Sequence, residues 1–94
     1  MSSTTKTTEL LRRVAESPDI DLRTLGVLTA ILIDEKDPDD ITRRYLEEKY
    51  HIGEGSARRA IKLLSELGIY QRVIVGFGKY KTIINYEWGT EKWI

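Results

Sequence analysis

With 94 residues, the chain can hold one domain with a modest core, and 40% hydrophobic with 32% charged residues is the composition of an ordinary globular domain. No apolar run approaches the roughly 20 residues of a membrane helix, and the N-terminus lacks the basic start and apolar segment of a secretion signal. Cysteine is absent, which excludes disulfides and thiolate metal sites, and a cytoplasmic protein with no membrane contact is expected.

The first predicted element is a short amphipathic helix over residues 8–17, which ends before Pro18. One side of this helix is apolar, with Leu10, Leu11 and Val14. Because isolated helices of this length are marginal in water, the apolar side must pack against something. It covers either the domain's own core or a second subunit.

A second helix is predicted from Leu22 to about Asp34, with Asp21 as its N-cap. Its apolar face forms the floor of the domain and contains Leu25, Leu28, Ile31 and Leu32. Gly26 inside this helix costs about 1 kcal/mol relative to alanine, which indicates close contact with another helix. The acidic segment 34–40 is interpreted as a solvated loop that caps the next helix, since its carboxylates lack calcium-loop spacing.

Residues 41–68 have the pattern of two helices joined by a tight turn. Thr42 is the expected N-cap of a helix over residues 43–50, which buries Leu46 and Tyr50 on one face. The residues His51-Ile52-Gly53 interrupt the helix, and Ile52 is buried in the corner between the two helices. Gly53 is expected to adopt backbone angles that other residues resist.

The second helix of this pair is predicted from about Glu54 to Leu67, and Gly68 ends it in a left-handed conformation. Its apolar positions form one continuous face, made of Ala57, Ala60, Ile61, Leu64 and Leu67. Ile69 supplies the hydrophobic contact that accompanies such a helix end.

Two strands are predicted over residues 71–75 and 80–88, with Gly76-Phe77-Gly78 as the hairpin turn. Lys79 and Lys81 lie on one face of the second strand. Phe77 is interpreted as a lid over the domain's own core, with packing on a sugar or wedging of a base step as the alternative. Near the C-terminus, Trp88 and Trp93 either close the sheet or form a dimer contact.

Residues 22–88 resemble the winged helix-turn-helix superfamily of DNA-binding domains, because Leu46, Ile52 and Ala57 fill its apolar positions. Glu47 and His51 depart from the usual small residue and glycine. The resemblance implies a left-handed backbone conformation at His51, which histidine visits at modest cost. The resemblance implies a mainly α fold with a small β-hairpin (α+β), in which a three-helix core is joined by an N-terminal helix and a C-terminal two-stranded wing. It divides the chain into a tail and helix over residues 1–20, one domain over residues 21–88, and a tail over residues 89–94.

The charges are segregated along the chain, although the net charge is zero and the isoelectric point of about 6.6 is below the value typical of DNA-binding domains. Between Arg43 and Lys81 nine basic and four acidic residues give a net +5, and the flanks carry the compensating −5. Screening at physiological salt acts over about 8 Å, so distant acids do not cancel a basic patch.

The resemblance and the charge pattern together predict a sequence-specific protein that binds double-stranded DNA, a transcriptional regulator of a prokaryote, virus or mobile element. The second helix would enter the major groove and the wing would contact the backbone. A homodimer on a palindromic site is expected. The expected DNA contacts are Arg43, Arg44, Gly55, Ser56, Arg58, Arg59, Lys62, Arg72, Lys79 and Lys81.

The sequence contains little that indicates an enzyme. The single histidine, His51, lies in the predicted turn, and Ser56 has no neighbouring base. No catalytic residue, metal site, cofactor or small-molecule ligand is therefore predicted. The alternative functions are a winged domain that binds protein and an accessory subunit of a replication or recombination complex.

Overall fold

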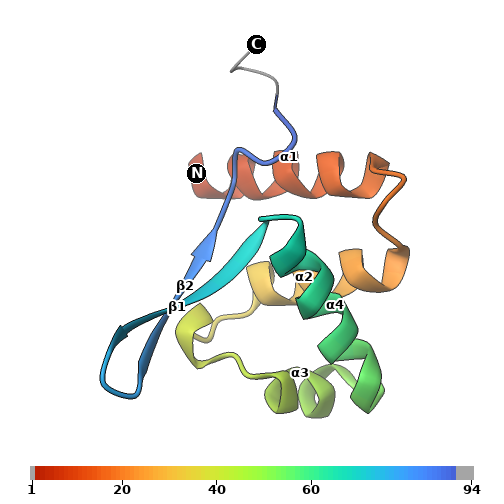
Figure 1. Ribbon diagram of the computed structural model, residues 1–94. Helices are drawn as coiled ribbons and strands as arrows, with labels where there is room; N and C mark the ends of the chain where they lie inside the picture. Colours follow the sequence, from red (N-terminus) through yellow and green to blue (C-terminus); the bar gives the residue numbers. More distant parts are fainter. Residues whose placement is uncertain (1, 91–94) are drawn as a thin grey trace.

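The predicted fold class is confirmed by the computed structural model, which describes residues 2–90 and is mainly helical with a C-terminal antiparallel hairpin (Figure 1). A helix-turn-helix precedes the hairpin, as in a winged helix-turn-helix layout. The elements in chain order are α1 (Ser2–Glu16), α2 (Leu22–Ile33), the 3₁₀ turn η1 (Pro38–Asp40), α3 (Arg43–Tyr50), α4 (Glu54–Glu66), β1 (Tyr70–Gly76) and β2 (Lys79–Ile84).

The core lies where α2 packs against α4, with α1 on the other side of α2 (Figure 1). Leu10 and Val14 of α1 are completely buried in the same core as Leu28 and Leu64. Of the two alternatives for the N-terminal helix, the structure therefore supports packing on the chain's own core. The buried side of α1 is not available to a second subunit.

Gly26 corrects one of the sequence predictions. It is exposed, and a Cβ added to it would have no atom within 4 Å. Close helix contact is therefore not the reason for glycine at this position. The small residues that let two helices approach are on α4, where Ala57 and Ala60 are buried.

The turn between α3 and α4 forms largely as predicted. The hydroxyl of Thr42 accepts from the amide of Tyr45 at 3.0 Å, and His51 ends α3 at φ 57° and ψ 40°. The expectation for Gly53 is wrong, because its φ of −65° is open to any residue. All the backbone strain of this turn is at His51.

At the end of α4, Gly68 and Ile69 have the roles that the sequence predicts. Gly68 has a φ of +80°, and its amide donates to the carbonyl of Ser65. The amide of Ile69 donates to the carbonyl of Leu64, and the Ile69 side chain is completely buried. The chain therefore leaves α4 in a fixed direction and enters β1.

Asp34 is the exception in the segment 34–40, which is otherwise mostly exposed as predicted. Its side chain is 0% exposed and accepts hydrogen bonds from the hydroxyls of Tyr50 and Tyr45 and from Nζ of Lys49, at 2.6, 3.0 and 3.0 Å. The hydrogen bond from Tyr50, followed by one from the Lys36 amide, holds the pKa of Asp34 far below its ordinary value. Asp34 therefore pins the end of α2 to α3.

The 3₁₀ turn η1 has a structural role that the sequence does not reveal. The Asp39 carboxylate accepts from the amide of Thr82, and the Pro38 carbonyl accepts from the Thr82 hydroxyl at 3.3 Å. Arg72 of β1 donates to the Asp39 carbonyl. The turn therefore covers the outer edge of β2 and fixes the base of the hairpin to the helical body.

The hairpin closes through Phe77 and Gly78, which follow a register shift between Ile74 and Gly76. Gly78 has a φ of +69°, a conformation that favours glycine. Phe77 at the tip is fully exposed, so the interpretation of this side chain as a lid over the core is wrong. The hairpin projects from the body (Figure 1), and Phe77 lies in the turn between its two strands.

The second strand is shorter than predicted, since residues 85–89 turn away from the sheet. The side chain of Arg13 in α1 donates to the carbonyls of Tyr86 and Trp88, both at 2.6 Å. Trp88 is half-buried against the core, and Trp93 lies outside the described residues. No helix in residues 2–90 combines the length and apolar composition that crossing a membrane requires.

Candidate nucleic-acid interface

The exposed face of α4 is cationic because its apolar residues all lie on the other side. Ala57, Ala60 and Leu64 are buried against the core at helical spacing. Ile61 also packs against this core, whereas Arg58, Arg59 and Lys62 are exposed and form the outer face of the helix. Within residues 2–90 none of the three forms an ion pair.

The N-terminal turn of α4 lies beneath the guanidinium of Arg59. A Cβ on Gly55 would be 2.9 Å from Nη1 of Arg59, so the absence of a side chain at residue 55 gives the guanidinium its place. No side chain caps this end of the helix, which leaves first-turn amides open. The guanidinium of Arg59 adds to the partial positive charge of the helix N-terminus, and the carboxylate of Glu54 in the same turn offsets part of that charge. Cation, open amides and dipole together favour a bound anion.

Arg23 of α2 is a functional candidate that sequence reasoning missed. Its Nη1 lies 3.3 Å from the hydroxyl of Ser56, to which it donates, so it joins Arg59 at the start of α4. The two hydrogen-bonded residues are 33 positions apart, and only the packing of α2 against α4 brings them together. Its position two residues after the Asp21 N-cap of α2 contains no signal of this role.

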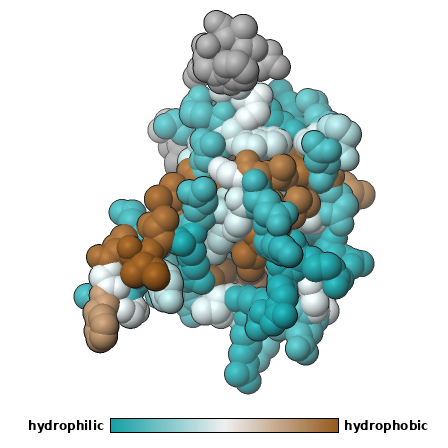
Figure 2. All heavy atoms as spheres, viewed as in Figure 1, coloured by the Kyte–Doolittle hydropathy of each residue, from teal (hydrophilic) through white to brown (hydrophobic). Residues whose placement is uncertain are grey.

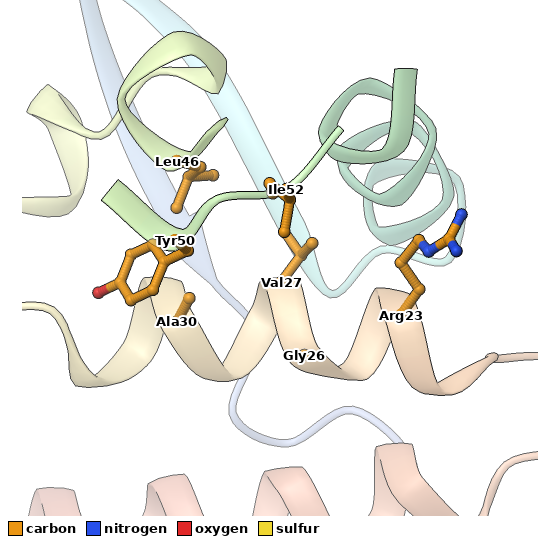
Figure 3. Close-up of a pocket in the computed structure, with 7 residues that line it drawn as sticks. All are labelled: Arg23, Gly26, Val27, Ala30, Leu46, Tyr50 and Ile52. Carbon is orange, nitrogen blue, oxygen red and sulfur yellow. The ribbon is translucent and has the colours of Figure 1, made fainter. Parts of the chain in front are cut away.

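A pocket of about 240 Å³ lies between α2 and the turn that joins α3 to α4 (Figure 3). Its walls are mostly apolar, with Arg23 at one end, and the lining residues are Arg23, Gly26, Val27, Ala30, Leu46, Tyr50 and Ile52. The volume is below the roughly 300–1,000 Å³ of ordinary small-molecule sites. The Tyr50 hydroxyl donates to Asp34 and is not available to a ligand in the pocket. Among the lining residues, Arg23 is the one that carries a charge.

The two predicted contacts on α3 already have counterions. Nε of Arg43 lies 3.9 Å from Glu47, and Nε of Arg44 lies 3.3 Å from Glu48, each one turn along the same helix. The Arg44–Glu48 pair is exposed and contributes little to stability, so a phosphate can replace its carboxylate. The Glu47 side chain is only 18% exposed, and its Oε2 has no hydrogen-bond partner among the described residues, so Arg43 is the one nearby charge that compensates it.

The hairpin separates Arg72 from the two lysines that were expected to act with it. Arg72 lies opposite Thr82 and Val73 opposite Lys81, so Arg72 and Lys81 are on different faces of the ribbon. Lys79 and Lys81 are exposed on one face, whereas Arg72 is held by the Asp39 carbonyl. The DNA contact expected of Arg72 stays a prediction, with a structural role beside it.

Side chains of two kinds gather on one face of the molecule. Figure 2 shows hydrophilic side chains over α4 and, on the same face, a hydrophobic hairpin that extends away from the body. The structure therefore presents a cationic helix and an apolar ribbon to one side. No match to this chain is found among protein-family profiles, curated proteins or solved structures.

Proposed function

We propose that this protein is a member of the winged helix-turn-helix superfamily that binds double-stranded DNA, with transcriptional regulation as its biological role. The observation that carries the proposal is the outer face of α4, where Arg58, Arg59 and Lys62 are exposed and unpaired among the described residues. In this proposal α4 enters the major groove, and the arginines reach guanine edges or flanking phosphates.

The start of α4 supplies a second contact with the DNA. Arg59 lies over the first turn and Arg23 donates to Ser56, so two guanidinium groups flank a helix end with open amides. A phosphate bound there would fix the depth at which α4 lies in the groove. In DNA-bound protein Ser56 would share its hydroxyl between Arg23 and this phosphate.

The remaining cations extend this surface along the backbone. Arg44 exchanges its exposed glutamate partner for a phosphate, and Arg43 contacts the backbone from its place beside Glu47. Lys79 and Lys81 act from the hairpin. A homodimer on a palindromic site completes the proposal, because one small module makes few base contacts. Because the apolar side of α1 is buried in the chain's own core, the proposed dimer contact does not use that side.

The exposed apolar hairpin favours a second candidate function. A ribbon with several exposed hydrophobic side chains is also what a protein-binding domain or an accessory subunit of a replication or recombination complex would present. Titration of a random duplex at low salt separates the candidates, because only the first proposal requires binding to DNA without a protein partner.

The decisive variants are Arg58→Ala and Arg59→Ala, tested by fluorescence polarisation on a duplex selected from a random pool. Either arginine should cost about 1–3 kcal/mol of binding free energy if it reads a base, and the loss should be smaller on random sequence. Arg12→Ala is the matched control, since Arg12 is exposed on α1, which lies on the other side of α2. Unchanged affinity in the double variant would remove α4 from the DNA.

A further inference from the structure

The hairpin carries more exposed apolar surface than a two-stranded ribbon requires. Five of its large hydrophobic side chains have exposed fractions between 44% and 106%, and they are Ile74, Val75, Phe77, Tyr80 and Ile83. Together they expose on the order of 500 Å² of apolar area. This is as large as the largest patch on a typical monomer, and such patches are often functional.

Both faces of the ribbon are involved. Ile74 pairs with Tyr80 and lies on the same face as Arg72, whereas Ile83 lies on the face of Lys81. A hydrophobic cluster inside the protein would use one face only. An occupant must therefore surround the projecting end of the hairpin, as a groove does.

The charge of the hairpin identifies the chemistry of that occupant. Residues 70–84 contain Arg72, Lys79 and Lys81 and no acidic residue. A second copy of the same hairpin would bring two sets of three cations together, which is unfavourable. The complementary surface is apolar and bordered by anions. The minor groove has this character, since its sugar walls lie between two rows of phosphates.

We infer that the hairpin enters the minor groove and that Phe77 wedges between two base pairs, so that the protein bends the DNA it binds. The inference rests on the proposed function, to which it adds an activity. Phe77 is the first residue of the turn Phe77-Gly78, and its chain neighbours Gly76 and Gly78 have no side chains that would block its approach. Apolar wedges of this kind unstack a base step and kink the duplex by about 20–90°.

The base of the hairpin is fixed to the helical body, so the position of the inserted Phe77 would be fixed as well. Thr82 and Arg72 are hydrogen-bonded to η1, which joins α2 to α3. The ribbon is therefore held against the helical body at its base and is free at its tip. A wedge inserted by Phe77 is thus held in a defined place relative to α4.

The test measures DNA bending and DNA binding separately, by energy transfer between dyes at the ends of a selected duplex and by polarisation. Wild-type protein should shorten the end-to-end distance at saturation. Phe77→Ala should lose most of the bend while its affinity falls by less than about tenfold, whereas Phe77→Leu, which keeps an apolar wedge, should retain part of it. Because Phe77 is fully exposed, neither variant should unfold the protein.

Lys79→Ala is the control within the same hairpin. It should weaken binding on all sequences and reduce the salt slope by about one unit, yet keep the bend once the duplex is saturated. Binding by wild-type protein without bending would overturn the inference and leave the proposed function intact. No binding to any duplex would overturn both. A concentration-dependent dimer without DNA that Phe77→Ala abolishes would instead make the hairpin a protein contact and overturn the wedge.

Discussion

Replacing Gly26 by alanine should stabilise the protein, and the structure allows the size of the effect to be worked out. The residue lies inside α2, is exposed, and has no atom within 4 Å of an added Cβ. Alanine therefore gains its full advantage in a helix interior, about 1 kcal/mol of unfolding free energy, with no clash to offset it. For a domain of this size, that corresponds to a rise of about 4–8 °C in the melting temperature.

The measurement is urea and thermal denaturation followed by far-UV circular dichroism, with Gly68→Ala as the opposite control. Gly68 has a φ of +80°, where a side chain costs about 1–2 kcal/mol, so this second substitution should destabilise. DNA affinity should change in neither variant by more than the loss of folded protein explains. A neutral or destabilising Gly26→Ala would mean that α2 is packed against something the structure does not show there.

Two further predictions concern the helix-turn-helix and its anchor. His51→Gly should raise the unfolding free energy by roughly 0.5–1 kcal/mol, since it relieves a left-handed residue at φ 57°; a loss of stability would mean that the imidazole makes a needed contact. The lowered pKa of Asp34 contributes stability that is fully present above pH 3.8 and is lost as the pH falls toward the folded-state pKa. The raised pKa values of Lys49 and Tyr50 contribute stability that is fully present below pH 10.5 and 10.0 and is lost above them. Denaturation across this pH range should give a plateau with two falling limbs, and Asp34→Asn should flatten the acid limb; an unchanged limb would remove Asp34 from its assigned role.

The parts of the fold that could be predicted are those set by neighbouring residues. Thr42 caps α3 and Gly68 ends α4 because each acts on backbone groups within a few positions. The resemblance predicts the left-handed conformation of His51, because His51 stands where the family usually has glycine, and the structure has that conformation. Helical spacing was enough to identify the outer face of α4.

The parts that could not be predicted depend on residues far apart in the sequence. Asp34 and Asp39 look like solvated acids of a loop, yet their partners Tyr50 and Thr82 are 16 and 43 positions away. Arg23 became a candidate only through its contact with Ser56. The error at Phe77 has the same origin, because whether a turn reaches the core depends on how the whole ribbon leaves the body.

The two hydrogen bonds of Arg13 join residues 73 and 75 positions apart, so they form only when two distant parts of the chain have met. Contacts over such a separation close a long loop, whereas the packing of α2, α3 and α4 joins nearer neighbours in the sequence. The link between α1 and residues 86–88 is therefore expected to form late in folding, after these helices have packed.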